Sequence, residues 1–134
     1  MDYSEIRTLV VDDMDNIRGL MVSILRDMGF EKIVEAKDGF AGRESILAYA
    51  KQGTAFDLII SDINMPKLSG LELLGDIRSR KSKISDTPFI LVSTENEMEI
   101  ITQAMSLGVS NYIIKPFHFD VVKEKIERTL KNLS

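Results

Sequence analysis

The sequence predicts an α/β fold in which a doubly wound parallel sheet of five strands is covered by five helices. Short apolar runs alternate along the chain with stretches whose apolar residues recur at helical spacing, and this alternation favours a parallel sheet with right-handed crossovers. The runs are nearly continuous in apolar residues, which is typical of strands buried on both faces. With 134 residues and no linker-like tract, we expect a single domain over residues 1–134.

The strands are expected where Val, Ile, Leu and Phe cluster. Their ranges are Ile6–Val11, Lys32–Ala36, Phe56–Ser61, Pro88–Ser93 and Ser110–Ile114. The second range, KIVEA, is the least apolar, which favours a place at the edge of the sheet. The charged stretch Ser79–Pro88 is expected to be a surface connection.

The helices are expected from apolar stripes with the spacing i, i+3, i+4 and i+7. The first stripe consists of Ile17, Leu20, Met21, Ile24, Leu25 and Met28. Gly29 follows that stripe directly and is expected to end the first helix. Four further helices are expected over residues 39–51, 71–77, 101–108 and 121–133. Most of the seven methionines occupy apolar helix positions, so we interpret them as core residues.

The composition excludes several kinds of chemistry. The chain has no cysteine, which removes disulfides, thiol catalysis and thiolate metal sites. One histidine, His118, cannot form a multi-histidine zinc site, and a Ser–His–Asp triad would depend on it alone. A net charge of −4 disfavours nucleic-acid backbones as partners. No apolar run approaches the roughly 18 residues of a membrane span, and no signal segment begins the chain, so we expect a cytoplasmic protein without a membrane partner.

Polar residues follow four of the five expected strands. They are Asp12 and Asp13 after the first strand, Asp62 and Asn64 after the third, Ser93 and Thr94 at the end of the fourth, and Lys115 after the fifth. Each one alone is ordinary, because an aspartate after a strand commonly belongs to a turn or a helix cap. In open parallel sheets, however, ligands bind outside the carboxyl ends of the strands. The joint placement therefore predicts a site at this edge of the sheet.

Three carboxylates at one edge call for a cation. Two unit charges about 4 Å apart repel by roughly 4 kcal/mol at an effective dielectric constant near 20, and one lysine cannot neutralise three carboxylates. Mg²⁺ prefers oxygen ligands of this kind and binds through one or two carboxylates, water and phosphate. A carboxylate beside Mg²⁺ and a lysine suits phosphoryl transfer to that carboxylate. Asp62, which stands alone at its strand end, is the expected nucleophile.

Nearly the whole chain, from about Arg7 to Leu133, resembles response-regulator receiver domains, and in particular the single-domain CheY-like members. The segments that carry the resemblance are LVVDD at 9–13, ISDINMP at 60–66, LVST at 91–94 and YIIKPF at 112–117. The resemblance implies the flavodoxin-like strand order 2-1-3-4-5 that is known for flavodoxin and CheY.

The resemblance also implies a role for each matching residue at the site. Asp62 matches the phosphoacceptor, and Lys115 matches the lysine that contacts first this aspartate and then the phosphoryl oxygen. Asp13 matches a direct Mg²⁺ ligand, and Asp12 matches one that acts mostly through water. Asn64 matches the residue whose backbone carbonyl completes the metal shell.

A second group of matching residues concerns switching. Ser93 matches the switch hydroxyl, the backbone N–H of Thr94 faces the phosphoryl group, and Tyr112 matches the aromatic switch residue. The bond between Lys115 and Pro116 is commonly cis in such domains. His118 has no partner histidine, so the phosphoryl donor is expected to be a histidine on another protein.

These roles imply a two-component response regulator that accepts a phosphoryl group from a sensor histidine kinase. Such a protein is a regulator, and its catalysis is limited to its own phosphorylation and dephosphorylation. Its output would be a downstream protein contacted by the fourth helix, fifth strand and fifth helix, with chemotaxis and the flagellar motor as one output. Motor-binding members often carry lysines where this chain has the acidic run Glu95–Glu99. A phosphorelay intermediate and a receiver fragment of a larger regulator are the alternatives.

Two rival classes share part of the pattern. Phosphatases of the haloacid dehalogenase kind also use a strand-end aspartate, Mg²⁺ and a lysine. They need an acid two positions after the nucleophile, where this chain has Asn64, which cannot donate a proton in that role. A pseudo-receiver that acts only as a binding module would lack a member of the acidic pair, the acceptor or the lysine, and all of these are present.

Overall fold

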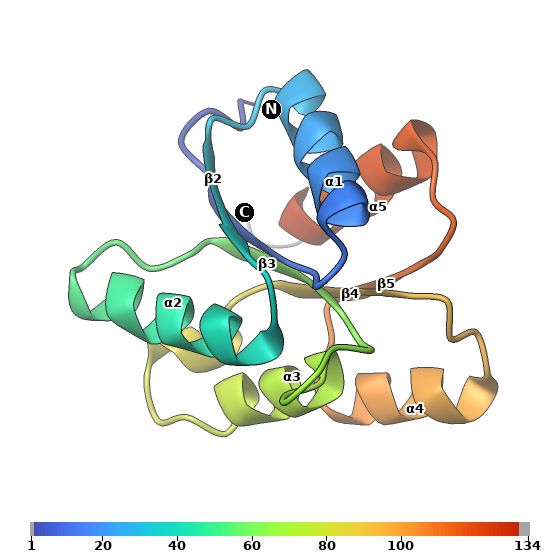
Figure 1. Ribbon diagram of the computed structural model, residues 1–134. Coiled ribbons are helices and arrows are strands. Elements are labelled where there is room, and N and C mark those ends of the chain that lie inside the picture. The colour runs from blue at the N-terminus through green and yellow to red at the C-terminus, as the bar shows by residue number, and fades with distance from the viewer. Residues whose placement is uncertain (1, 132–134) are drawn as a thin grey trace.

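The computed structural model describes residues 2–131 and contains one parallel sheet with the strand order β2-β1-β3-β4-β5 (Figure 1). The strands are β1 (Arg7–Val11), β2 (Lys32–Ala36), β3 (Leu58–Asp62), β4 (Phe89–Ser93) and β5 (Asn111–Ile114). The predicted fold class is confirmed, as is the strand order implied by the resemblance. The partly exposed strand β2 lies at an edge, as its weaker apolar pattern predicted.

The helices form two layers around this sheet. Within the described residues they are α1 (Asp15–Met28), α2 (Gly39–Lys51), α3 (Gly70–Arg78), α4 (Met98–Ser106) and α5 (Phe119–Lys131). Helices α1 and α5 cover one face, and α2, α3 and α4 cover the other (Figure 1). None of the helices described is long and apolar enough to cross a membrane. The last predicted helix ran to Leu133, which lies outside the described residues.

The central strands are buried on both faces because neighbouring residues point to opposite layers. Ile60 of β3 packs with residues of α1 and α5. Its neighbour Ile59 packs with residues of α2, α3 and α4. Every residue of β3 and β4 is buried, which explains why their sequences are nearly continuous in apolar residues instead of alternating. The expected surface connection before β4 contains one short 3₁₀ turn, Lys83–Asp86.

The structure corrects the core assignment of several methionines. Met21 is buried as expected, but Met105 is 68% exposed, and Leu20 of the first helical stripe is 46% exposed. Met14 and Met98, neither of which lies in a helix interior, are 50% and 75% exposed. Helical periodicity identifies the side of a helix that faces the sheet, but the width of the contact depends on the neighbouring elements.

The start of α3 is held against the end of β3. The Gly70 amide donates a hydrogen bond to the Ile63 carbonyl, with an N–O distance of 2.9 Å. Ser69 and Glu72 cap the helix reciprocally, each side chain accepting a hydrogen bond from the other residue's amide. A methyl group at Gly70 would overlap the backbone carbonyl of Asp62. A glycine at this position therefore allows α3 to approach the strand end that carries Asp62.

We predict that Gly70→Ala lowers the free energy of unfolding by about 1–3 kcal/mol, because backbone must shift to admit the methyl group. The matched control is Gly75→Ala in the same helix, where the new Cβ would lie 3.6 Å from Leu107, an ordinary contact. The control is expected to gain about 0.5–1 kcal/mol from improved helix propensity. Urea denaturation of both variants measures the difference, and effects of the same sign would contradict this explanation.

Candidate functional site

Four charged side chains meet at the carboxyl ends of β1, β3 and β5. One carboxylate oxygen each from Asp12, Asp13 and Asp62 lies within 4.8 Å of the others. The Lys115 Nζ atom is 3.3 Å from Asp12 Oδ2 and 3.3 Å from Asp62 Oδ1. The convergence that the sequence predicted is therefore present, with the lysine placed between two of the three carboxylates.

The two aspartates after β1 have different surroundings. Asp12 is 5% exposed, and its amide donates a hydrogen bond to the Ala36 carbonyl at the end of β2. Its Oδ1 atom accepts a hydrogen bond of 2.9 Å from the Met14 amide. Asp13 is exposed to solvent. The chain thus leaves β1 with one fixed inner carboxylate and one outer carboxylate at the surface.

Asp62 is the last residue of β3 and is 6% exposed. Burial raises the pKa of its carboxyl group, because the charged form is removed from water. The charge of Lys115 opposes this effect, and the charge of Asp12 adds to it. The Ile63 amide donates a hydrogen bond of 2.9 Å to Asp62 Oδ1 and also opposes it. The net direction is upward, so burial and Asp12 outweigh the groups that stabilise the anion.

A cavity of about 460 Å³ opens beside these carboxylates. Its polar lining consists of Asp13, Asp62, Asn64, Thr94 and Lys115. Its apolar lining consists of Met14, Ile17, Leu20, Pro116 and Phe117. The cavity gives a reactant access to Asp62 and places the predicted Asn64 and Thr94 at its border. This apolar wall was not predicted from the sequence, although Ile17 and Leu20, which line it, belong to the apolar stripe of α1.

Ser93 and Tyr112 meet at the backbone of Glu95. Ser93 is fully buried, and its Oγ accepts a hydrogen bond of 3.1 Å from the Glu95 amide. The Tyr112 hydroxyl donates a hydrogen bond of 2.7 Å to the Glu95 carbonyl. Burial raises the pKa of that hydroxyl, and its interaction with Ser93 partly opposes the shift. The two predicted switch residues thus hold the same peptide segment, just before α4.

The expected cis peptide bond between Lys115 and Pro116 is present. Lys115 follows β5 directly and leads to Phe117, which is buried in the core layer beneath α1 and α5. Phe117 and Pro116 also line the cavity. The segment after β5 therefore supplies both the lysine and part of the apolar wall.

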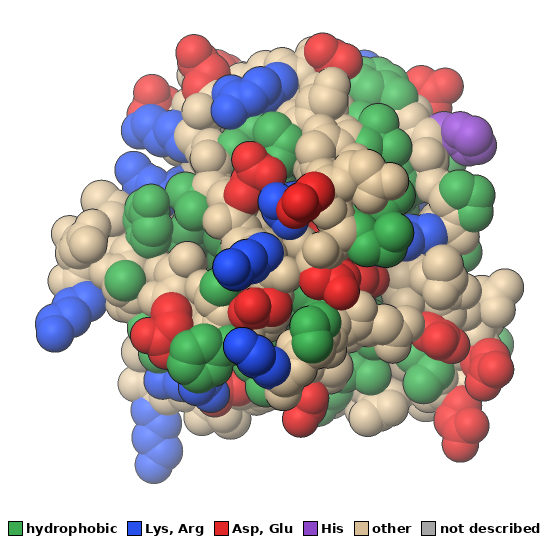
Figure 2. All heavy atoms as spheres, in the orientation of Figure 1, with side chains coloured by type: hydrophobic (Ala, Val, Ile, Leu, Met, Phe, Trp, Pro, Cys, Tyr) green, Lys and Arg blue, Asp and Glu red, His purple; other side chains and the backbone are tan. Residues whose placement is uncertain are grey.

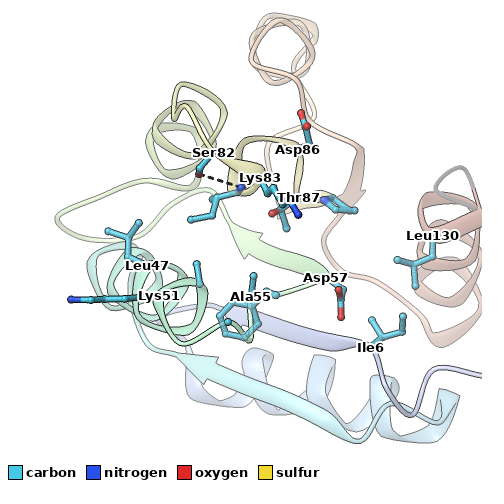
Figure 3. Close-up of a pocket in the computed structure, with 15 residues that line it drawn as sticks. Ile6, Leu47, Lys51, Ala55, Asp57, Ser82, Lys83, Asp86, Thr87 and Leu130 are labelled. Carbon is cyan, nitrogen blue, oxygen red and sulfur yellow. Dashed lines mark hydrogen bonds between the residues drawn. The ribbon is translucent and has the colours of Figure 1, made fainter.

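A larger cavity of about 1000 Å³ lies at the opposite end of the sheet, between the end of α2 and the 3₁₀ turn (Figure 3). Its lining includes Ile6, Phe56 and Pro88, which precede strands β1, β3 and β4. Lys51 and Asp57 also border it, and Asp57 accepts a hydrogen bond from the Arg7 amide. Within the described residues, the cluster of Asp12, Asp13 and Asp62 lies at the carboxyl ends of the strands, beside the cavity of about 460 Å³. That smaller cavity is therefore the candidate functional site.

Comparisons with known proteins agree with the fold and identify the family. The family model of the response regulator receiver domain matches residues 8–127. Chemotaxis protein CheY-3 of Vibrio cholerae is 35% identical over 127 residues, covering 95% of this chain and 93% of its own. Chemotaxis protein CheY1 of Helicobacter pylori is 36% identical over 124 residues, covering 92% of this chain and 96% of its own.

A solved structure shows the same architecture. Chemotaxis protein CheY4 of Vibrio cholerae superposes with a TM-score of 0.80 and 30% identity, covering 92% of this chain and 98% of its own. The match of the family model and the identity with the relatives both extend over most of the sequence. On this basis the chain belongs to the response regulator receiver domain family.

Proposed function

We propose that this protein is a cytoplasmic two-component response regulator whose Asp62 accepts a phosphoryl group from a phosphohistidine of a sensor kinase. The observation that carries the proposal is the position of Asp62 at the cavity, 3.3 Å from Lys115 and within 4.8 Å of the other two carboxylates. A carboxylate with a lysine and further anionic oxygens at hand has the groups that phosphoryl transfer needs. Membership of the receiver family supports this assignment.

The donor set at the site fits Mg²⁺. Three carboxylates come together with no histidine or cysteine among them, and hard oxygen donors of this kind favour Mg²⁺ over softer metals. Asp12, Asp13 and Asp62 would hold the ion together with the backbone carbonyl of Asn64. When bound, Mg²⁺ supplies positive charge that offsets the negative charge on the phosphoryl oxygens.

The residues of the chain have distinct parts in the proposed transfer. A carboxylate oxygen of Asp62 attacks the phosphorus in line, and the bond from phosphorus to the donor's imidazole nitrogen breaks. Lys115 is already within ion-pair distance of Asp62 and would follow the charge onto a phosphoryl oxygen. The Thr94 backbone N–H would donate a hydrogen bond to another oxygen. The regulator thus catalyses its own modification and acts on no other substrate.

The proposed output depends on the connection between Ser93, Glu95 and Tyr112. If the Ser93 hydroxyl turns toward the phosphoryl group, the Glu95 amide loses its acceptor and Tyr112 gains room to move inward. Glu95 leads directly into α4, so the change reaches the surface formed by α4, β5 and α5. We propose that a downstream protein binds this surface in the phosphorylated state.

The α4 part of this surface has its own character. Met98 and Met105 of α4 are exposed, as is the neighbouring Ile114 of β5. The chain has three glutamates and no lysine or arginine between residues 94 and 114. Figure 2 shows red acidic and green hydrophobic side chains at the lower right, over α4, with no blue among them. The names of the relatives favour a chemotaxis output, and this surface favours a target with basic residues.

The first prediction concerns the acceptor. When the wild-type protein is incubated with Mg²⁺ and acetyl phosphate, it is expected to gain the mass of one phosphoryl group. The Asp62→Asn variant is expected to gain none. The matched control, Asp27→Asn on the exposed side of α1, should behave as the wild type. Removal of Mg²⁺ with EDTA should abolish the gain. Intact mass spectrometry measures it, and a gain that persists in Asp62→Asn would refute the assignment.

The second prediction concerns stability without metal. Asp62→Asn is expected to raise the free energy of unfolding in EDTA at pH 7 by about 1 kcal/mol, or about 4 °C in melting temperature. The reason is that burial raises the pKa of Asp62, so its ionised form destabilises the folded state. The gain should begin to shrink as the pH falls through the folded-state pKa and should be lost below the unfolded-state pKa, because the wild-type carboxyl is then neutral in both states. Urea denaturation at several pH values tests this, and a loss of stability at pH 7 would contradict it.

The third prediction concerns the switch. With Mg²⁺ and beryllofluoride, which mimics a phosphoryl group on a carboxylate, hydrogen exchange at the Glu95 amide should become about fivefold faster, equivalent to one hydrogen bond of about 1 kcal/mol. Ser93→Ala should exchange fast in both states, and Ser106→Ala at the end of α4 is the matched control. NMR-detected exchange provides the measurement. Equal exchange rates in the wild type with and without beryllofluoride would rule out this route.

A further inference from the structure

Arg18, in the first turn of α1, joins three separate parts of the chain. Its Nη1 atom donates to the Asp12 carbonyl at 2.8 Å. Its Nη2 atom is 2.7 Å from Asp15 Oδ1, and its Nε atom is 3.0 Å from Glu35 Oε1 on β2. The side chain is 15% exposed. The guanidinium group therefore connects the end of β1 with the start of α1 and with the edge strand β2.

The bond from Arg18 completes the set of contacts that hold Asp12. The Asp12 amide binds the Ala36 carbonyl, and the two carboxylate oxygens contact the Met14 amide and the Lys115 ammonium group. The remaining polar group, the carbonyl, is the one that Arg18 binds. Each polar group of Asp12 thus has a partner, and each partner comes from a different residue.

The Asp12 carbonyl matters because it belongs to the peptide that joins Asp12 to Asp13. This carbonyl and the amide of Asp13 lie in one rigid plane. The hydrogen bond from Arg18 therefore sets the plane from which the Asp13 side chain projects. Asp13 is exposed, whereas Asp12 and Asp62 are buried. The outer carboxylate of the cluster thus depends on the peptide plane for its direction more than the two inner ones do.

The geometry of an arginine suits this task, and that of a lysine does not. A guanidinium group is a planar fork that donates in fixed directions, whereas an ammonium group is a point charge on a flexible chain. Asp15 and Glu35 occupy two nitrogens of the fork and leave the third aimed at the carbonyl. Arg18 reaches the site through a carbonyl, so it does not compete with a cation for the carboxylate oxygens of Asp12 or Asp13.

We propose that Arg18 is a positioning residue that presets the turn from Asp12 to Asp13 for cation binding. The inference rests on the proposed function, in which these carboxylates hold Mg²⁺. Under this proposal α1 and β2 also contribute to the metal site, in addition to the strand ends that carry Asp62 and the segment that carries Lys115. Residues that orient metal ligands typically change metal affinity by 10- to 100-fold when they are replaced.

A simple effect of charge would have the opposite sign. Arg18 is a cation near the cluster, so removing its charge would by itself strengthen the binding of Mg²⁺. Positioning predicts instead that the binding weakens. It also predicts that Arg18→Lys, which keeps the charge, fails to rescue the affinity because the fork is lost. The direction of the change therefore separates the two explanations.

The experiment compares Arg18→Lys and Arg18→Met with the matched controls Arg26→Lys and Arg26→Met, which lie on the exposed side of the same helix. Mg²⁺ is titrated in the absence of a phosphodonor, and binding is followed by NMR through the amides of Asp13 and Ile63. Both Arg18 variants are expected to bind Mg²⁺ about tenfold more weakly than the wild type. Both controls should bind as the wild type does. Melting curves in EDTA identify any variant that is unfolded at the titration temperature.

Wild-type affinity in Arg18→Lys, or unchanged or tighter binding in Arg18→Met, overturns the inference. If Arg18→Met does not fold, Arg18→Lys decides the question alone. Phosphorylation of the wild type by acetyl phosphate is measured in the same preparation. A wild type that gains a phosphoryl group while Arg18→Lys keeps its Mg²⁺ affinity refutes the positioning role and leaves the proposed function intact. A wild type that neither binds Mg²⁺ nor gains the group refutes both.

Discussion

The ion pairs of Lys115 with two buried aspartates are the interaction on which the rest of the site depends. Asp12 and Asp62 are almost fully buried, and a buried anion is costly unless it is paired. The lysine follows β5, an edge strand that pairs with β4 alone, and yet it reaches the ends of β1 and β3. This one side chain therefore links the ends of β1, β3 and β5, although β5 is the neighbour of neither β1 nor β3 in the sheet. One positive charge still leaves the cluster of three carboxylates with excess negative charge, which favours a cation there.

The same segment connects the site to the molecular surface over a short path. Tyr112 precedes Lys115 by three residues on β5, and its hydroxyl holds the Glu95 carbonyl. Ser93, at the end of β4, holds the amide of the same residue. Glu95 stands between a buried strand and the start of α4, so a change in either bond acts on the entry to that helix. The proposed signal thus requires no long chain of intermediates, because two neighbouring strands present the partners of one peptide segment.

The cavity beside Asp62 shows how apolar residues serve the site as well as the core. Met14 and Leu20 are about half exposed and line this cavity together with Pro116. An apolar wall next to a carboxylate reduces access of water and contributes to the burial that raises the pKa of Asp62. The helical stripe that predicted α1 includes Leu20, which is 46% exposed and lines this cavity instead of packing in the core. Helical periodicity identifies the side of a helix that faces the sheet. The neighbouring loops decide whether the residues at the edge of that side are buried.

The sequence by itself determined the strand and helix order, because continuous apolar runs and helical stripes depend on local spacing. It also placed Asp12, Asp13, Asp62 and Lys115 at strand ends, and parallel strands bring such ends to one edge. Their roles in phosphoryl transfer stay predictions, as do those of Asn64, Ser93, Thr94 and Tyr112. Only the tertiary structure decided that Lys115 lies between two aspartates, that Ser93 and Tyr112 share Glu95, and that Arg18 holds the Asp12 carbonyl. The physical reason is that these contacts join segments far apart in the chain, and their geometry depends on sheet register and helix packing, which no local pattern encodes.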